Sequence, residues 1–324
     1  MTFRWGVVGP GAIAARFADG MTLVDGGTIT AVASRALERA NAYGDKYGIA
    51  TRYASYEDLA ADSEVDVVYV ATPHSRHERD TVVLVEAGKH VLCEKPFALN
   101  TRQAQRMVDA ARAHGVFLME AMWTRFLPSY RALVDVLGRG RIGAPLVVEA
   151  DFGFRMPVVP EHRLFDASLG GGSLLDLGVY PVQLCSLVLG TPDRVVADGA
   201  IGETGVDERV AGVLHHADGS LGVVKAAIRA SLSCTARITG TDGWVELPAF
   251  MHCPDWITVG GPGGVERIDA AYAGDGLRFQ VHEVHRCIGD GRTESDIMPL
   301  DETLRIMTTL DAMRAQLGVV YPGE

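Results

Sequence analysis

The first 121 residues alternate short, continuously apolar runs with stretches that have helical periodicity. The apolar runs lie at residues 3–9, 28–34, 65–72, 90–95 and 116–121. The helical stretches begin at about residue 12 and at Ser55, and extend over 36–47, 75–88 and 100–115. Ser55, with Asp58 three residues later, and Asn100 are expected to cap helices. Apolar strands separated by helices are typical of parallel strands buried on both faces, so residues 1–121 are predicted to form a parallel α/β domain.

The pattern changes after about residue 122. Strands now carry hairpin signals, because Asp218-Gly219 and Asp242-Gly243 are pairs that favour tight turns between antiparallel strands. Helical stretches in this half lie at 128–138, 172–189, 276–288 and 302–317. We therefore predict a second α/β domain over residues 122–324, with a mostly antiparallel sheet and helices on one side.

Length and composition narrow the function classes. A chain of 324 residues exceeds what one core usually serves, which agrees with two domains. The formal net charge of −11, without a run of basic residues, argues against a nucleic-acid partner. The sequence has neither a long uninterrupted apolar stretch nor the apolar core of a signal peptide, so no membrane association is expected. Five scattered cysteines fit a reduced, cytoplasmic protein.

A glycine-rich turn follows the first apolar run. Residues 9–14, "GPGAIA", have the spacing G-x-G-x-x-A between a predicted strand and a predicted helix. Gly9 allows the tight turn, and Gly11 lets the backbone approach a pyrophosphate at the start of the helix. Ala14 permits close packing of the helix on the strand. With Ala12 and Ile13, the turn predicts a dinucleotide-binding loop.

The end of the second strand indicates which dinucleotide is bound. An acidic residue at this position would bind the ribose 2′-hydroxyl of NAD. The sequence instead has Ser34 and Arg35, with Arg39 one helical turn later. A hydroxyl and a guanidinium suit a 2′-phosphate, which accepts charge-assisted hydrogen bonds. NADP is therefore favoured and NAD stays possible; the alternative is that Arg35 is a solvated residue at the start of a helix.

A lysine ends one of the buried apolar runs. In "VLCEKPFAL", residues 91–99, the run stops at Glu94 and Lys95, and Pro96 follows. Parallel sheets bind ligands at the carboxyl ends of their strands, so Lys95 is expected in the cofactor crevice. Pro96 would fix the backbone beyond it, with a cis peptide bond as one option. Pairing of Lys95 with a surface acid is the alternative. The cofactor-lining residues expected at these strand ends are Thr72, Pro73, His74, Glu94, Lys95, Trp123 and Arg125.

A second polar pair lies in "LGGGSLLDLGVYPVQL", residues 169–184. Asp176 and Tyr180 are four residues apart and would share one face of a helix. Pro181 is unfavourable inside a helix, so we expect it to kink the helix and help to aim Tyr180. Taken alone, a packed core tyrosine beside a helix-start aspartate is the simpler interpretation.

Four motifs together carry a resemblance to a known family. "GPGAIA", "EKP", "EAMWTRFLP" and "GGGSLLDLGVYP" resemble the Gfo/Idh/MocA family of glucose–fructose oxidoreductase and inositol dehydrogenase. The resemblance covers nearly the whole chain and is strongest to the dimeric dihydrodiol dehydrogenase and NADP-dependent D-xylose dehydrogenase branch. It implies an N-terminal Rossmann fold and a C-terminal α/β domain built on an open, mostly antiparallel sheet. That sheet commonly forms the interface of a homodimer or homotetramer.

The resemblance also implies residue roles. The lysine of the E-K-P motif, here Lys95, lies near the nicotinamide in the family. Many members have a D-x-x-x-H motif, whereas this chain has Tyr180 in place of the histidine, which disfavours inositol-type dehydrogenation and points to Tyr180 as the proton-transfer group. Free tyrosine, with a pKa of about 10, is a poor base at neutral pH. A nearby Lys95 cation would favour the phenolate, and Asp176 could hold Lys95 or the substrate hydroxyl.

Other side chains are expected around the substrate, and no metal is required for this chemistry. The pairs His74/His77 and His282/His285 lack a matching acid or cysteine cluster and are interpreted as non-ligands. Core packing is the alternative for Trp123, which is otherwise expected to face the crevice. The expected substrate-contacting residues are Trp123, Phe154, Arg163, Phe165 and Phe279.

The sequence favours an NADP-dependent oxidoreductase that acts on a secondary alcohol of a sugar or cyclic diol. One alternative is a reductase of a keto-sugar, such as 1,5-anhydrofructose or a nucleotide-linked 3-ketosugar. Another is a non-catalytic NADP-binding regulator, which would need the glycine loop but not Lys95, Asp176 and Tyr180 together. Strands between about 194 and 270 would leave one sheet face uncovered, which predicts a homo-oligomer.

Overall fold

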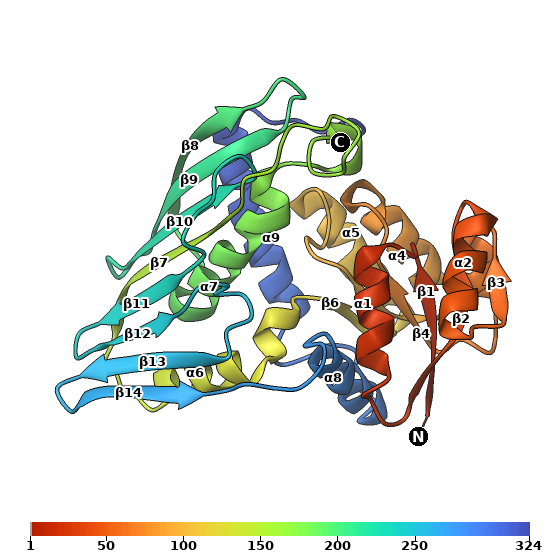
Figure 1. Cartoon of the computed structure of the whole chain (residues 1–324), viewed down its shortest axis with the longest axis horizontal. Coiled ribbons are helices and arrows are strands. Elements are labelled where there is room, and N and C mark those ends of the chain that lie inside the picture. Colours follow the sequence, from red (N-terminus) through yellow and green to blue (C-terminus); the bar gives the residue numbers. More distant parts are fainter. Residues whose placement is uncertain (1) are drawn as a thin grey trace. The chain divides into compact units, whose positions relative to one another are not determined.

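The structure is a computed structural model that describes residues 2–324 (Figure 1). Contacts within the chain divide it into two units. The first unit contains the residues up to Phe126 together with Ala273–Thr303, and the second contains Leu127–Tyr272 and Leu304–Glu324. The boundary expected from the sequence, between residues 121 and 122, differs from this division chiefly because Ala273–Thr303 returns to the first unit.

The first unit contains a six-stranded parallel sheet, as predicted. Its strand order is β3-β2-β1-β4-β5-β6, and every neighbouring pair is parallel. The strands are β1 (Phe3–Val8), β2 (Gly27–Ala33), β3 (Thr51–Tyr53), β4 (Val67–Val70), β5 (His90–Cys93) and β6 (Leu118–Glu120). Five of these strands and their parallel arrangement were predicted; β3 was not, because three residues reading Thr-Arg-Tyr form no apolar run.

Helices between these strands begin at the caps that the sequence indicates. The Ser55 hydroxyl accepts a hydrogen bond from the Asp58 backbone N–H at 3.1 Å, and the Asn100 side chain accepts one from Gln103 at 2.8 Å. Both predicted caps are therefore confirmed. The helices are α1 (Ala12–Met21), α2 (Leu37–Tyr47), α3 (Tyr56–Ala61), α4 (His77–Glu86) and α5 (Thr101–His114), with 3₁₀ turns at His74–Arg76 and Trp123–Phe126.

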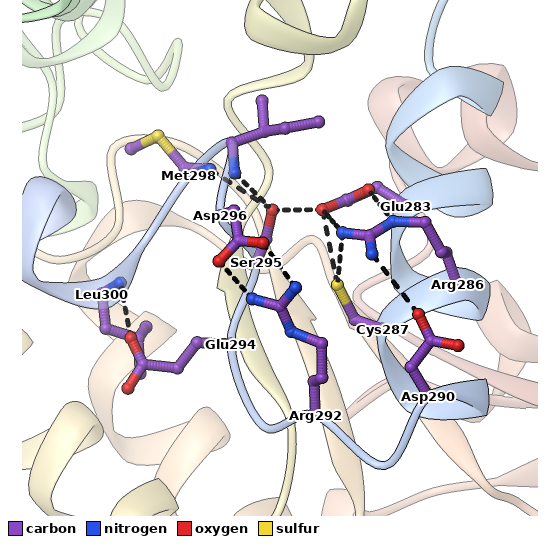
Figure 2. Close-up of polar contacts among 11 residues, drawn as sticks. Glu283, Arg286, Cys287, Asp290, Arg292, Glu294, Ser295, Asp296, Met298 and Leu300 are labelled. Atoms are coloured by element: carbon purple, nitrogen blue, oxygen red, sulfur yellow. Dashed lines mark hydrogen bonds and ion pairs between the residues drawn. The ribbon is translucent and has the colours of Figure 1, made fainter.

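The returning segment packs on the first unit through helix α8 (Arg278–Gly289). The Trp5 indole N–H donates to His285 Nε2 at 2.9 Å, and the rings of Phe3 and His285 stack at 4.5 Å. Figure 2 shows how the loop after α8 is fastened: Ser295 and Arg286 both donate to the Glu283 carboxylate. The bond from Ser295 ties the loop to α8, whereas Arg286 and Glu283 both lie within the helix.

The second unit contains an eight-stranded sheet in the order β14-β13-β12-β11-β7-β10-β9-β8. The pair β7·β10 is parallel and the other neighbours are antiparallel, so the predicted hairpins at Asp218-Gly219 and Asp242-Gly243 are confirmed. The strands are β7 (Pro145–Gly153), β8 (Arg194–Ile201), β9 (Asp207–His215), β10 (Leu221–Ala227), β11 (Ala236–Gly240), β12 (Trp244–Leu247), β13 (Trp256–Gly261) and β14 (Gly264–Asp269).

Three more helices are α6 (Pro128–Gly138), α7 (Val179–Leu189) and α9 (Leu300–Leu317). Helix α7 packs against β7 and β10 (Figure 1). The stretch 172–189, predicted as one helix, is divided: a π-helical turn at Leu174–Gly178 precedes α7. Pro181 thus lies in the first turn of α7, three residues after the end of the π-helical turn.

By length and composition alone, Ala167–Leu189 could cross a membrane. In this structure 78% of its apolar window is buried inside the protein, which is typical of a core helix. Its apolar character is therefore accounted for by packing.

Candidate active site

The glycine loop of the first unit has the geometry that a dinucleotide requires. Gly9 has a φ of +81°, and a Cβ placed on it would come within 2.8 Å of the Ala71 backbone. A Cβ on Gly11 would meet only the Gly9 carbonyl oxygen, at 3.9 Å, so the backbone there is approachable. Ala14 is fully buried, and its carbonyl accepts a hydrogen bond from the Tyr43 hydroxyl at 2.7 Å. The loop therefore fits a pyrophosphate at the start of α1.

An open groove of about 470 Å³ lies beside this loop and α2. Two cations line it, Arg39 and Lys46, which are seven residues apart and so share one face of α2. Lys46 was not predicted to bind the cofactor, although its spacing from Arg39 indicates a shared helix face. The lining residues are Pro10, Gly11, Ala12, Ala15, Arg39, Ala42, Tyr43, Lys46 and Tyr47.

At the end of β2, Arg35 is exposed and Ser34 is buried. The Ser34 hydroxyl accepts a hydrogen bond from the Ala36 backbone N–H at 3.3 Å, which stabilises the turn into α2. Burial raises the pKa of the Tyr56 phenol, and the nearby Arg35 cation partly opposes this rise. The two residues are thus at the ligand-binding edge of the sheet, and their contact with a 2′-phosphate stays a prediction.

His77 connects the ends of β4 and β5. Its Nε2 lies 2.8 Å from the Thr72 carbonyl oxygen, and its Nδ1 lies 2.9 Å from the Pro96 carbonyl oxygen. A neutral ring donates to one of these carbonyls, and burial, which lowers the pKa of His77, favours the neutral ring. The neutral ring therefore donates to one of the two predicted cofactor-lining segments and only lies against the other. This position of His77 was not predicted from the sequence.

Lys95 follows a buried acid whose partner is on the neighbouring strand. The Tyr69 hydroxyl donates to Glu94 Oε1 at 2.5 Å, and the Lys95 backbone N–H donates to Glu94 Oε2 at 3.2 Å. Burial raises the pKa of Glu94, and the Lys95 cation opposes this rise. The Lys95–Pro96 peptide bond is cis, the option that the sequence analysis considered.

Trp123 and Arg125 lie in the 3₁₀ turn after β6, and both are buried. The Arg16 guanidinium lies over the Trp123 ring at 5.3 Å, and Arg125 forms a buried ion pair with Glu302 at 2.6 Å. These partners give both residues a structural role. Their predicted contacts with cofactor or substrate stay predictions.

In the second unit, Asp176 lies in the π-helical turn and Tyr180 in the first turn of α7. Both side chains are buried. Arg163 binds Asp176 through two hydrogen bonds, of 2.9 and 3.3 Å. The partner predicted for Asp176 was Lys95 or a substrate hydroxyl, and Arg163 was predicted to contact the substrate. The structure joins the two residues in one half-exposed ion pair.

Aromatic rings surround the Tyr180 ring. Phe152 meets it edge-on at 5.5 Å, His252 lies tilted at 5.1 Å, and these two neighbours stack on each other at 4.4 Å. Two non-glycine residues near them have left-handed backbone conformations, Cys234 with a φ of 57° and Phe250 with a φ of 63°. Such strain persists where surrounding structure enforces it. Phe152 lies on β7 and His252 in the turn after β12, so their contacts with Tyr180 depend on the fold and were not predicted from the sequence.

The remaining predicted substrate residues differ in exposure. Phe154 is 38% exposed, whereas Phe165 is fully buried as a core residue would be. Phe279 is half-buried in α8, with the Arg278 guanidinium 4.5 Å from its ring centre. Their contacts with a substrate stay predictions.

Comparison with known proteins agrees with this arrangement. Residues 3–122 match the oxidoreductase family with an NAD-binding Rossmann fold, and residues 130–246 match the Gfo/Idh/MocA C-terminal domain. The trans-1,2-dihydrobenzene-1,2-diol dehydrogenase of Mus musculus is 37% identical over 100% of this chain and 99% of its own length. The Homo sapiens enzyme of that name is 36% identical over the same shares.

Solved structures show the same fold. A 3-ketoreductase from Actinomadura kijaniata, solved in complex with NADP and TDP-benzene, has a TM-score of 0.86 and 25% identity over 98% of both chains. An aldose-aldose oxidoreductase from Caulobacter crescentus has a TM-score of 0.89 and 24% identity, covering 98% of this chain and 97% of its own. With its NAD(P)-binding Rossmann unit and its matched C-terminal domain, the chain belongs to the Gfo/Idh/MocA family of oxidoreductases.

Proposed function

We propose that this oxidoreductase interconverts a secondary alcohol and a carbonyl on a cyclic diol or a sugar, with NADP as its cofactor. The observation that carries the proposal is the full-length identity of 37% to a dehydrogenase named for a cyclic trans-diol. The residues agree with it, because a fitted dinucleotide loop, Lys95, Asp176 and Tyr180 occur in one chain. A non-catalytic regulator would need only the dinucleotide loop.

When bound, NADP⁺ would accept the hydride in alcohol oxidation, and NADPH would supply it in carbonyl reduction. The chain's own residues manage the proton: when an alcohol is oxidised, the Tyr180 oxygen takes the hydroxyl proton, and in reduction it returns a proton to the carbonyl oxygen. In this proposal the Lys95 cation stabilises the phenolate form of Tyr180. The Asp176 carboxylate, held by Arg163, orients the reacting hydroxyl.

The cofactor choice rests on charge. Arg35 and Arg39 are exposed near the end of β2, and no acid replaces them at the expected ribose-binding position. Two guanidinium groups would make charge-assisted hydrogen bonds to a 2′-phosphate that NAD lacks. Lys46 adds another cation, beside Arg39 in the groove along α2.

Reduction of a keto-sugar is the second candidate. The similarity to the NADP-bound 3-ketoreductase favours it. That enzyme was also solved as a tyrosine-to-phenylalanine variant and as a lysine-to-alanine variant. In this chain we assign proton transfer to a tyrosine, Tyr180, and its electrostatic support to a lysine, Lys95. The direction that predominates depends on the substrate and not on these residues.

One panel separates these candidates. The purified protein would be mixed with NADP and cyclic trans-diols or aldoses, and with NADPH and keto-sugars, and NADPH absorbance would be followed. Turnover of the diols with NADP supports the first candidate, and faster turnover of keto-sugars supports the second. Absence of turnover across the panel contradicts both.

We further propose a homodimer in the cytoplasm that uses the second sheet as its interface. Val196, Val213 and Val223 lie side by side on three neighbouring strands, on the sheet face opposite the buried alternate residues. Val196 is 45% exposed, and an apolar row of this kind favours a two-fold contact. None of the five cysteines, all within the described residues, forms a disulfide, as expected in a reducing compartment. A monomer mass from light scattering at micromolar concentration would contradict the dimer. The substitution Val213→Glu should dissociate the dimer.

A further inference from the structure

The loop before the Tyr180 segment contains three consecutive glycines, Gly170–Gly172. Gly172 has a φ of +114°, and a Cβ on it would lie 2.3 Å from Asp207 Oδ1 and 3.3 Å from the Tyr321 hydroxyl. The glycine run in the motif "GGGSLLDLGVYP" therefore has a structural cause. It makes room for two side chains that come from distant parts of the second unit.

The first of these side chains is Asp207, the first residue of β9. It is fully buried, and its Oδ2 accepts a hydrogen bond from the Ser173 hydroxyl at 2.7 Å. The same oxygen accepts a hydrogen bond from the Leu174 backbone N–H at 2.6 Å. Leu174 begins the π-helical turn that contains Asp176 and leads into Tyr180. The carboxylate thus satisfies a backbone donor at the start of this segment, where a negative charge is also favourable.

The second side chain is Tyr321, near the end of the chain. Its hydroxyl donates to the Gly171 carbonyl oxygen at 2.6 Å, and the residue is buried. The Arg314 guanidinium lies 5.1 Å from the Tyr321 ring and also pairs with Glu324 at 2.6 Å. The last residues of the chain are therefore tied to the glycine loop.

We infer that Asp207 is a positioning residue for Tyr180, and that Tyr321 assists it by holding the loop that precedes the Ser173–Tyr180 segment. Neither residue is proposed to touch substrate or cofactor. The inference rests on the proposed role of Tyr180 in proton transfer. Catalytic groups must be held to within a fraction of an ångström, and a misplacement of about 1 Å can cost on the order of 100-fold in rate.

The charge state of Asp207 agrees with this role. Burial raises the pKa of Asp207 to about 6, while the hydrogen bonds from Ser173 and Leu174 act in the opposite direction. The two hydrogen bonds thus favour the carboxylate form that burial disfavours. An ionised group is costly to bury unless it makes compensating hydrogen bonds, and those bonds are the ones that hold the Tyr180 segment.

Three variants test the inference. Asp207→Ala removes both hydrogen bonds, Asp207→Asn keeps an acceptor of similar shape without the charge, and Tyr321→Phe removes only the hydroxyl. Asp198→Asn makes the same chemical change at an exposed site on the neighbouring strand β8 and serves as the matched control. For each variant, kcat and KM would be measured with the best substrate of the panel. NADP affinity and the amide hydrogen exchange of residues 173–180 would also be measured.

We expect Asp207→Ala to lower kcat by about 10- to 100-fold while the dissociation constant of NADP changes less than about twofold. Hydrogen exchange in 173–180 should become faster, and the pH dependence of kcat should shift, because Tyr180 is no longer held in place. Asp207→Asn and Tyr321→Phe should show smaller changes of the same kind, and Asp198→Asn none. If Asp207→Ala does not fold, Asp207→Asn carries the same test.

The inference is wrong if Asp207→Ala has the same kcat, pH profile and hydrogen exchange as the wild type. It is also wrong if the Asp198→Asn control loses as much activity as Asp207→Ala. Failure of the proposed function is a separate result. A wild-type protein that turns over no substrate of the panel would contradict that function. The exchange measurement would then still decide whether Asp207 holds the segment.

Discussion

The cofactor loop of the first unit and the Tyr180 segment of the second are built in opposite ways. Six consecutive residues, 9–14, form the tight turn of the loop, its approachable backbone and the start of the helix. The Tyr180 segment depends on Asp207, Tyr321, His252 and Arg163, which come from other elements. A local site can be read from a motif, whereas a site held by long-range contacts needs the fold.

The sharpest test of this comparison removes one group from each unit. Tyr180→Phe deletes only the hydroxyl, so we expect kcat to fall by about 10²–10⁴-fold, the usual contribution of acid–base catalysis. Lys95→Met should cause a loss of similar size. Neither change should unfold the protein, and thermal melting is the control. Steady-state assays with the best panel substrate measure the effect.

The two residues should also be coupled. Once Tyr180 is phenylalanine, the further change Lys95→Met should cost much less than it does alone, because groups that act as a unit are not additive. Additive losses would show that Lys95 and Tyr180 act in separate steps. Near-normal turnover of Tyr180→Phe would mean that another residue carries the proton.

The same contrast explains what sequence analysis could and could not supply. The caps at Ser55 and Asn100, the glycine loop and the two Asp-Gly hairpins were predicted, because each depends on residues a few positions apart. The π-helical turn was not, since the Asp207 carboxylate from β9 caps its first backbone N–H. The return of α8 to the first unit was missed too, because it depends on the contact of Trp5 with His285.

Buried carboxyl groups offer a second way to compare the units. Glu120 in the first unit is fully buried, and Thr303 donates to it at 3.0 Å. Asp207 in the second unit accepts two hydrogen bonds that start a helical segment. Burial raises the pKa of Glu120 to about 7, whereas the Thr303 hydrogen bond and the Arg125 cation lower it. We therefore expect the charged form of Glu120 to destabilise the folded protein. Unlike Asp207, Glu120 is assigned no role in positioning the Tyr180 segment.

The sign of the pH effect follows from this shift. Because the pKa of Glu120 is higher in the folded state than the usual 4.5, folding is favoured at low pH, and this advantage is lost as pH rises from about 4.5 through about 7. Glu120→Gln should therefore raise the unfolding free energy at pH 8 relative to wild type by at most about 3 kcal/mol, and much less at pH 5. Urea unfolding at both pH values measures this, and a pH-independent difference would contradict it.

The smallest expected effect concerns the most local feature, the end of β2. Arg35→Ala should weaken NADP by about 10- to 100-fold, the usual worth of one charge-assisted hydrogen bond, and should leave NAD nearly unchanged. Lys46→Ala is the informative companion, because Lys46 shares the groove with Arg39 but was not indicated by the motif. A similar selective loss in Lys46→Ala would place the 2′-phosphate farther along α2 than the sequence predicts. Fluorescence titration of each variant with both cofactors distinguishes these outcomes. If Arg35→Ala loses affinity for NAD and NADP equally, this arginine does not recognise the 2′-phosphate.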